Sequence, residues 1–298
     1  MTQPDTREPW TIGAVLKWAA DDFRARGIES PRLDAEVLLA HALACSRTQL
    51  IIDMMRPLAT EELSRFRELV KRRRHREPVA YLRGEREFYG RTFRVDARVL
   101  VPRPDTETLI DVALGRTRHL SMSARVLDLC TGSGCVAVTL ALTRPTTQVT
   151  ATDISEPALA LAQENALRLG APLVAFARAD LFGALRGPFD LITANPPYIA
   201  SAEVETLAPD VRQFEPRLAL DGGEDGLVLV RRILEDAPAR LAKGGVLAME
   251  IGAGQADAVA ALFVARGFEE LERARDLARI ERVVSGVWNK GPATGVSR

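Results

Sequence analysis

The sequence predicts an α/β protein: a doubly wound parallel sheet preceded by a small helical domain. From about Arg125 onward, short apolar runs alternate with segments of helix length, which is typical of βαβ units. The runs are apolar on both faces and rich in leucine or β-branched residues, as in strands covered by helices on both sides. They span 125–130, 148–153, 173–180, 189–197 and 244–251.

Length and composition narrow the class of protein further. The 298 residues suffice for about two domains, and 40 basic residues balance 40 acidic ones. Zero net charge removes any whole-molecule attraction to nucleic acid or membrane. No apolar stretch approaches the roughly 20 residues of a membrane span, and the amino terminus lacks the pattern of a secretory signal. Cys45, Cys130 and Cys135 form neither a disulfide framework nor a zinc motif, so we expect a cytoplasmic protein without a metal.

The first eighty or so residues predict a bundle of three helices. They begin at Thr11, at Ser30–Pro31 and at Thr60, and each carries apolar residues three and four positions apart. Residues 65–86 hold nine basic residues against three acidic ones, which indicates either a solvated helix face or a contact surface for RNA or an acidic partner.

Alternating apolar residues around Asp96–Ala97 predict a β-hairpin that ends at Pro102 and Pro104. The predicted domains are therefore a helical domain at 1–85, a hairpin connector at 86–104 and an α/β domain at 105–298.

A glycine turn follows the first strand of the sheet. Cys130-Thr131-Gly132-Ser133-Gly134 leads from Arg125–Leu129 into an apolar helix, so a ligand can approach the backbone and the helix amino terminus. Asp153 ends the next strand, where it can accept hydrogen bonds from the ribose hydroxyls of an adenosine or cap the following helix. This pattern fits a nicotinamide dehydrogenase and a methyltransferase that uses S-adenosylmethionine equally well. Asp128 can order the turn or approach a cofactor ammonium group, and we interpret Cys130 and Cys135 as small buried apolar residues.

The sequence Asn195-Pro196-Pro197-Tyr198 after the fourth strand decides between these readings. Two prolines fix the backbone and remove two N–H donors, so the local carbonyls become oriented acceptors. A planar NH₂ group fits this arrangement, with one hydrogen on Asn195, the other on the Pro196 carbonyl, and the Tyr198 ring over the plane. Acceptors on both hydrogens favour a nitrogen that attacks a methyl carbon, and no strong general base is required.

With these two motifs the chain resembles the HemK/PrmC family of glutamine methyltransferases. The similarity covers nearly the full length and includes segments 77–90, 101–110 and 211–227. It implies a Rossmann-like methyltransferase fold with a mostly parallel seven-stranded sheet and an N-terminal domain that docks the substrate. It also implies methyl transfer from S-adenosylmethionine to the side-chain nitrogen of the Gly-Gly-Gln glutamine in peptide chain release factors, which modulates translation termination.

The resemblance also implies roles for individual residues. Cys130, Thr131, Gly132, Ser133 and Gly134 would bind the methionine and ribose part of the cofactor, and Asp153 the ribose. Asp180 and Leu181 would flank the adenine, with Phe182 as an alternative because the family often has an aromatic residue there. Asn195, Pro196, Pro197 and Tyr198 would hold the glutamine amide, with Asp128 and Asn195 also near the cofactor. Arg103 and Glu107 would close over the methionine end or pair with each other.

Two other methyltransferases remain as alternatives. A sister enzyme that modifies a glutamine of a ribosomal protein has the same sequence motif in the glycine turn. Segments 101–110 and 211–227 favour the release-factor enzyme. A nucleic-acid adenine methyltransferase would use the same Asn-Pro-Pro-Tyr chemistry on a flipped base. Such an enzyme normally has a much more basic surface, so no direct contact with nucleic acid is expected.

Overall fold

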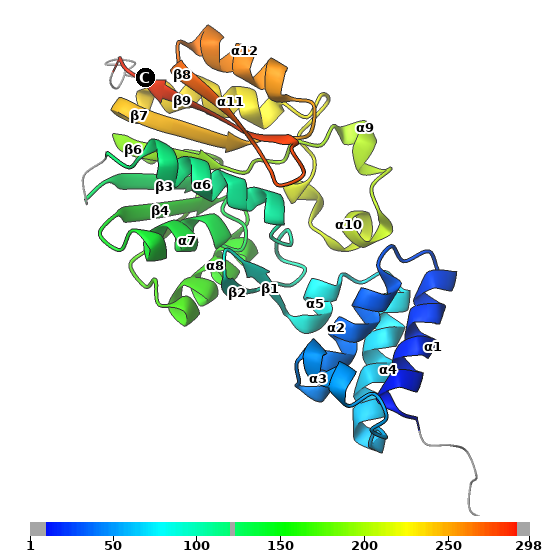
Figure 1. The fold of residues 1–298 in the computed structure, drawn as a ribbon. Helices are drawn as coiled ribbons and strands as arrows, with labels where there is room; N and C mark the ends of the chain where they lie inside the picture. Colours follow the sequence, from blue (N-terminus) through cyan, green and yellow to red (C-terminus); the bar gives the residue numbers. More distant parts are fainter. Residues whose placement is uncertain (1–9, 120–122, 291–298) are drawn as a thin grey trace, which may run out of the picture. The chain divides into compact units, whose positions relative to one another are not determined.

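The computed structural model describes residues 10–119 and 123–290, which form two compact units (Figure 1). The first unit comprises the chain up to Gly84 together with 209–214, and the second comprises 85–208 and the chain from Glu215 onward. The acidic amino terminus, residues 1–9, lies outside the described residues. None of the helices in the described part combines the length and apolar character that crossing a bilayer requires.

The first unit is a helical bundle around Phe23, Leu38 and Phe66, all fully buried. The helices predicted at Thr11, Ser30–Pro31 and Thr60 are present as α1, α2 and α4. Thr11 caps α1 by accepting from the Ala14 amide, whereas Ser30 makes no capping hydrogen bond. Three short helices, α3, α5 and α10, were not predicted. The elements are α1 (Ile12–Ala25), α2 (Pro31–Leu43), α3 (Arg47–Ile52), α4 (Thr60–Arg74), α5 (Val79–Arg83) and α10 (Pro209–Phe214).

The second unit begins with a small antiparallel hairpin, which lies several residues earlier in the sequence than predicted. Strands β1 (Glu85–Phe88) and β2 (Arg91–Arg94) turn at Tyr89–Gly90, where both residues have positive φ. The prediction of a hairpin centred on Asp96–Ala97 was wrong, although the chain does turn there, with the Val99 amide donating to the Asp96 carbonyl at 3.1 Å. That stretch is buried on one side without strand pairing, so it mimics the alternation of a strand.

The second unit is built on one sheet, which among the described residues has seven strands in the order β5-β4-β3-β6-β7-β9-β8. Strands β3 to β7 are parallel. β9 runs antiparallel to β7, and the edge strand β8 pairs antiparallel with β9. The strands are β3 (Arg125–Leu129), β4 (Gln148–Asp153), β5 (Ala175–Arg178), β6 (Phe189–Ala194), β7 (Leu241–Glu250), β8 (Glu269–Arg275) and β9 (Glu281–Trp288).

Helices cover both faces of this sheet, as the doubly apolar strands predict (Figure 1). Leu127 and Leu129 of β3 pack toward α11 and α12, while Val126 packs toward α6, α7 and α8. The helices are α6 (Glu107–Arg116), α7 (Cys135–Thr143), α8 (Glu156–Leu169), α9 (Ser201–Val204), α11 (Val228–Asp236) and α12 (Ala256–Arg266). Short 3₁₀ helices lie at η1 (Pro104–Thr106), η2 (Arg217–Ala219) and η3 (Ala237–Ala239).

Candidate active site

The two motifs meet at the carboxyl edge of the sheet. Strands β3 and β6 are direct neighbours, and their register pairs Leu129 with Ala194. The glycine turn and the Asn195 loop therefore leave the sheet side by side. The chain order of the strands reverses between β3 and β6, which is where doubly wound sheets bind ligands.

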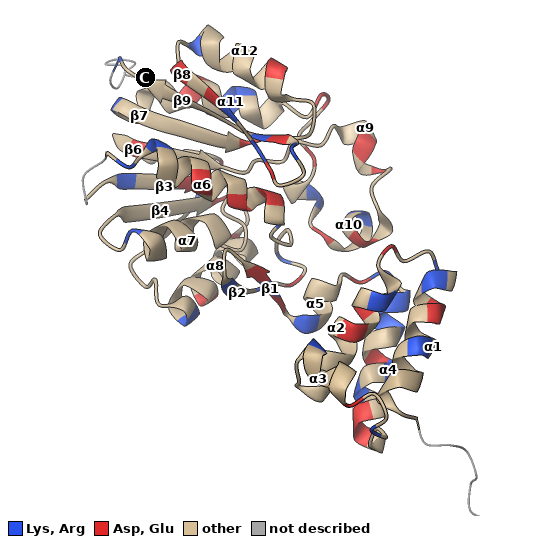
Figure 2. Cartoon of the chain, in the orientation of Figure 1, with Lys and Arg blue, Asp and Glu red and all other residues tan. Residues whose placement is uncertain are grey.

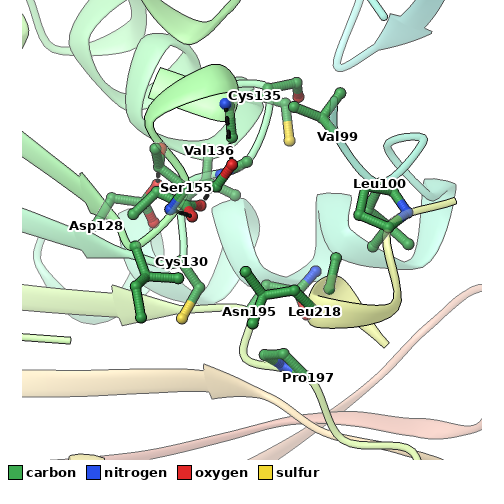
Figure 3. A pocket seen from close by; sticks show the side chains of 18 of the residues that line it. Val99, Leu100, Asp128, Cys130, Cys135, Val136, Ser155, Asn195, Pro197 and Leu218 are labelled. Carbon is green, nitrogen blue, oxygen red and sulfur yellow. Dashed lines mark hydrogen bonds between the residues drawn. The ribbon is translucent and has the colours of Figure 1, made fainter. Parts of the chain in front are cut away.

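A cavity opens between these loops, and most of the predicted site residues line it (Figure 3). The three that do not are Gly134, Pro196 and Tyr198. In Figure 3, the Cys130 and Asn195 side chains lie around the same space as those of Val99, Leu100 and Leu218. The predicted residues that line the cavity are Asp128, Cys130, Thr131, Gly132, Ser133, Asp153, Asp180, Leu181, Asn195 and Pro197.

The glycine turn uses its two glycines differently. Gly132 has φ +54° and its missing Cβ would meet nothing within 4 Å, so its backbone is open to a ligand. Gly134 has φ +80°, and a Cβ there would lie 3.1 Å from the Ala162 Cβ of α8. Gly134 therefore serves the close packing of the turn against α8. Cys130 also has a positive φ of 56°, a costly conformation for a non-glycine residue that is typical of functional loops.

Cys130 and Cys135 differ in their surroundings. Cys135 is buried, and burial raises the pKa of its thiol to about 12. Both cysteines line the cavity, but Cys130 is only half-buried, so the interpretation of both as buried was wrong for Cys130.

Asp153 orders the turn while lining the cavity. Its Oδ2 accepts from the Gly132 amide and its Oδ1 from the Ser155 amide, both at 2.9 Å. Ser155, whose hydroxyl accepts from Ala158, caps α8. The alternative of Asp153 as the cap is therefore wrong. Burial raises the pKa of Asp153, whereas its amide donors lower it.

Asp128 is almost fully buried on β3, beside Thr193 of β6. Its two oxygens accept from the Thr131 and Thr193 hydroxyls, each at 2.7 Å. Burial raises its pKa to about 7, although both hydroxyls favour the charged form. Asp128 thus joins the glycine turn to β6 through side chains.

Leu181, rather than Phe182, faces the cavity. Leu181 lines it with a positive φ of 53°, whereas Phe182 is 1% exposed and lies in the hydrophobic core, where the Arg240 guanidinium packs on its ring. Asp180 lies on the cavity rim and forms an ion pair with Arg232 at 2.8 Å.

Hydrogen bonds orient the Asn195–Tyr198 loop. Asn195 donates from Nδ2 to the Thr106 hydroxyl at 3.3 Å, which leaves its Oδ1 as the acceptor. The Tyr198 carbonyl accepts from Gln255 at 2.9 Å, and its hydroxyl donates to Glu250 at 3.3 Å. Burial raises the pKa of Tyr198, and the neighbouring Glu250 carboxyl raises it further.

Residues from two segments outside the strands complete the cavity, and the sequence gave most of them no predicted role. They come from 98–106 and 216–219. Arg103 pairs with Glu215 at 2.6 Å, and Glu215 also accepts from the Val101 amide. Glu107 instead accepts from the Tyr89 amide, so the predicted Arg103–Glu107 pair was wrong. Segments 101–110 and 211–227, which carry part of the family resemblance, hold these residues, but neither segment has a local pattern that predicts their pairing.

Comparisons with known proteins agree with this architecture. The family described as "PrmC N-terminal domain" matches residues 14–84, and "Methyltransferase small domain" matches 109–212. The chain is 46% identical to the release factor glutamine methyltransferase of Geobacter sulfurreducens, over 94% of this chain and 97% of that protein. It is 44% identical to the enzyme of the same name from Rhodopirellula baltica, over 96% of this chain and 99% of that protein.

A solved structure shares the fold alone. The hMettl16 catalytic domain, crystallised with an RNA hairpin, superposes with a TM-score of 0.56 at 15% identity. The match covers 68% of this chain and 77% of that domain.

Proposed function

Because this chain belongs to the family of release factor glutamine methyltransferases, we propose that its 195–198 loop grips the glutamine side chain of a release factor beside the cofactor. The enzyme is an S-adenosylmethionine-dependent protein glutamine methyltransferase. The proposed target is the Gly-Gly-Gln glutamine. We also assign the enzyme to the cytoplasm, which its three free cysteines support.

The cavity suits the cofactor. Gly132 offers open backbone, and Asp153 keeps both carboxylate oxygens near the cavity with lone pairs left for ribose hydroxyls. Leu181 gives an apolar wall for adenine in place of the aromatic residue that the family often has. When bound, S-adenosylmethionine supplies a methyl group on a positively charged sulfur.

The residues after β6 prepare the glutamine nitrogen. Asn195 Oδ1 accepts one amide hydrogen and the Pro196 carbonyl the other, so the nitrogen lone pair is drawn out of conjugation as the new bond forms. Within the described residues, no hydrogen bond occupies the Pro196 carbonyl. Holding the amide in one orientation supplies the entropic part of the rate. The Tyr198 ring lies over the plane of the amide in this proposal, and its hydroxyl is held by Glu250.

The adjacency of Asn195 to the glycine turn, fixed by the Leu129–Ala194 register, carries this proposal. Asn195→Ala should lower methyl transfer to release factor by about a hundredfold or more, because it removes one of two acceptors that act in the transition state. Cofactor affinity should change by less than about fivefold, because Asp153 and the glycine turn remain.

The measurement is mass spectrometry of a release factor after incubation with enzyme and cofactor, with calorimetry for cofactor binding. Asn289→Ala serves as the control, because this half-buried asparagine pairs with Glu269 and follows Trp288, which lies beside Gly245, at the opposite end of β7 from Glu250. Normal transfer by Asn195→Ala would refute the role of the loop. Methylation of ribosomal protein in place of release factor would reassign the substrate.

A further inference from the structure

Glu250 is a buried acid directly behind the Asn195 loop. It ends β7, the neighbour of β6, and the register pairs Met249 with Ala194. Glu250 and Asn195 are therefore the next residues along adjacent strands. Glu250 is 1% exposed and does not line the cavity, so it has no direct part in holding ligands.

Two hydroxyl groups connect Glu250 with the loop. Tyr198 donates to Glu250 Oε1 at 3.3 Å, and the Thr106 hydroxyl also interacts with the carboxyl group and favours its charged form. Thr106 in turn accepts from Asn195 Nδ2 at 3.3 Å. Within the described residues, Glu250 Oε2 is buried and accepts no hydrogen bond, so it is the oxygen left open for the proton of the nearby Thr106 hydroxyl.

The direction of these bonds determines which way the Asn195 amide faces. A hydroxyl has one proton to donate. If the Thr106 proton is directed at Glu250, Thr106 Oγ1 can only accept, and its partner on Asn195 must be the NH₂ group. Asn195 Oδ1 then faces the cavity. If Thr106 were free to donate to Asn195, the Asn195 amide could turn over. Its NH₂ group would then face the NH₂ group of the substrate glutamine, and no hydrogen bond could form between them.

We propose that Glu250 is a positioning residue that works through Thr106 to keep the Asn195 carbonyl oxygen turned toward the substrate amide. The inference rests on the proposed function of Asn195. It extends the site to a carboxyl group that touches neither substrate nor cofactor.

The charge state of Glu250 matters for this role. Burial raises its pKa to about 7, while the Thr106 and Tyr198 hydroxyls and Arg282 of β9 lower it and Asp105 of η1 raises it. Arg282 is itself paired with Asp105 at 3.1 Å and Asp276 at 3.0 Å. A protonated Glu250 would compete for the role of donor, so kcat at saturating cofactor should fall as the pH drops below about 7.

The test compares Glu250→Gln, Thr106→Val and Thr106→Ser with the wild-type enzyme. Glu250→Gln can donate an N–H to Thr106 and should lower kcat by about tenfold or more, and the decline below about pH 7 should disappear. Thr106→Val removes the acceptor and should cause a similar loss, whereas Thr106→Ser should recover at least about fivefold over the valine variant. The Glu250→Gln/Thr106→Val double variant should be no slower than the slower single variant, because both act through one contact.

Thr139→Val is the matched control, because Thr139 is fully buried in α7 and its hydroxyl has no partner among the described residues. It should retain wild-type kcat. Equal kcat for Thr106→Val and Thr139→Val would overturn the proposal, as would a wild-type pH profile for Glu250→Gln. If Glu250→Gln does not fold, the comparison of Thr106→Val with Thr106→Ser still tests the proposal. Normal transfer by Asn195→Ala would instead refute the proposed function itself, so the two failures are distinguishable.

Discussion

Two acidic side chains near the cavity, Asp128 and Glu250, link stability to pH. Burial raises the pKa of each to about 7. An acid whose pKa is higher in the folded protein than in the unfolded chain binds its proton more tightly when folded. Each residue therefore stabilises the fold least above about pH 7, where it is charged in both states.

Glu250→Gln makes this effect measurable. The free energy of unfolding of the wild type should fall relative to that of the variant as the pH rises from about 4.5 to about 7, by up to about 3 kcal/mol. The variant has no charge to bury, whereas the wild type progressively acquires one. Urea unfolding of both proteins at pH 5 and pH 8 provides the measurement. A difference between the proteins that is the same at both pH values would contradict the buried charge.

Gly226 packs closely against the backbone of Tyr198 in the Asn195–Tyr198 loop. It has φ +73°, and a Cβ there would lie 2.3 Å from the Tyr198 carbonyl oxygen. Gly226→Ala should displace Tyr198 and lower methyl transfer by about tenfold or more. Gly90→Ala is the control, because Gly90 has a similar φ of +70° but open space around it. Both variants carry the same backbone strain, so equal activities in a methyl-transfer assay would show that the contact with Tyr198 is unimportant.

Site residues that belong to a local sequence motif were predictable. Those that reach the site only through the order of the strands were not. Asn195 follows β6 and Asp153 ends β4, and both carry polar groups, so their place at the sheet edge could be predicted. Thr106 and Glu250 lie far from Asn195 in the sequence. They reach it only because β6 pairs with β7 and η1 packs beside them, and neither contact leaves a local pattern.

Some basic residues of helix α4 form ion pairs within the helical unit, whereas others are exposed. Arg73 is buried and bonded to Asp34 at 2.9 Å and Asp210 at 3.0 Å, and Arg74 pairs with Asp22 while packing over Trp18. Figure 2 shows acidic and basic residues intermixed on the helices of this unit. Reversing Arg73 would leave two acidic side chains facing a third, so such a variant tests folding and not docking.

Arg67 and Lys71 give a cleaner test of substrate docking. Both are exposed, and their spacing of four places them on one face of α4. If this face meets an acidic surface of the release factor, Arg67→Glu/Lys71→Glu should raise KM for the whole release factor by about tenfold with kcat little changed. Steady-state kinetics at two salt concentrations provides the measurement. Lys243→Glu/Arg266→Glu, at exposed positions of the other unit, controls for net charge, and equal KM values for the two double variants would exclude docking here.

Long elements with a clear period were predicted better than short ones. α1, α2 and α4 each span several turns, so an apolar stripe is visible in the sequence. α3 and α5 have six and five residues, too few to establish a period. The hairpin strands have four residues each, and the turn pair Tyr89–Gly90 lacks the usual Asn-Gly or Asp-Gly signal.

For the molecule as a whole, the amino-acid composition argued against some classes of function but did not identify the function. Equal numbers of acidic and basic residues argued against nucleic-acid binding without indicating a substrate. The parallel sheet followed from the apolar runs, whereas its seven-stranded, mostly parallel form followed only from the family resemblance. The strand order itself depends on long-range pairing.

The membership of α10 in the helical unit has a consequence for anyone who dissects this enzyme. Residues 209–214 come from the second half of the gene yet belong to the bundle, where Asp210 shares Arg73 with Asp34. A protease nick between Gly84 and Glu85 would yield two fragments that still co-purify, held together without a covalent bond. An expression clone ending at residue 84 would lack a piece of its own bundle, so a truncation intended to isolate that half needs 209–214 supplied as a graft or a peptide.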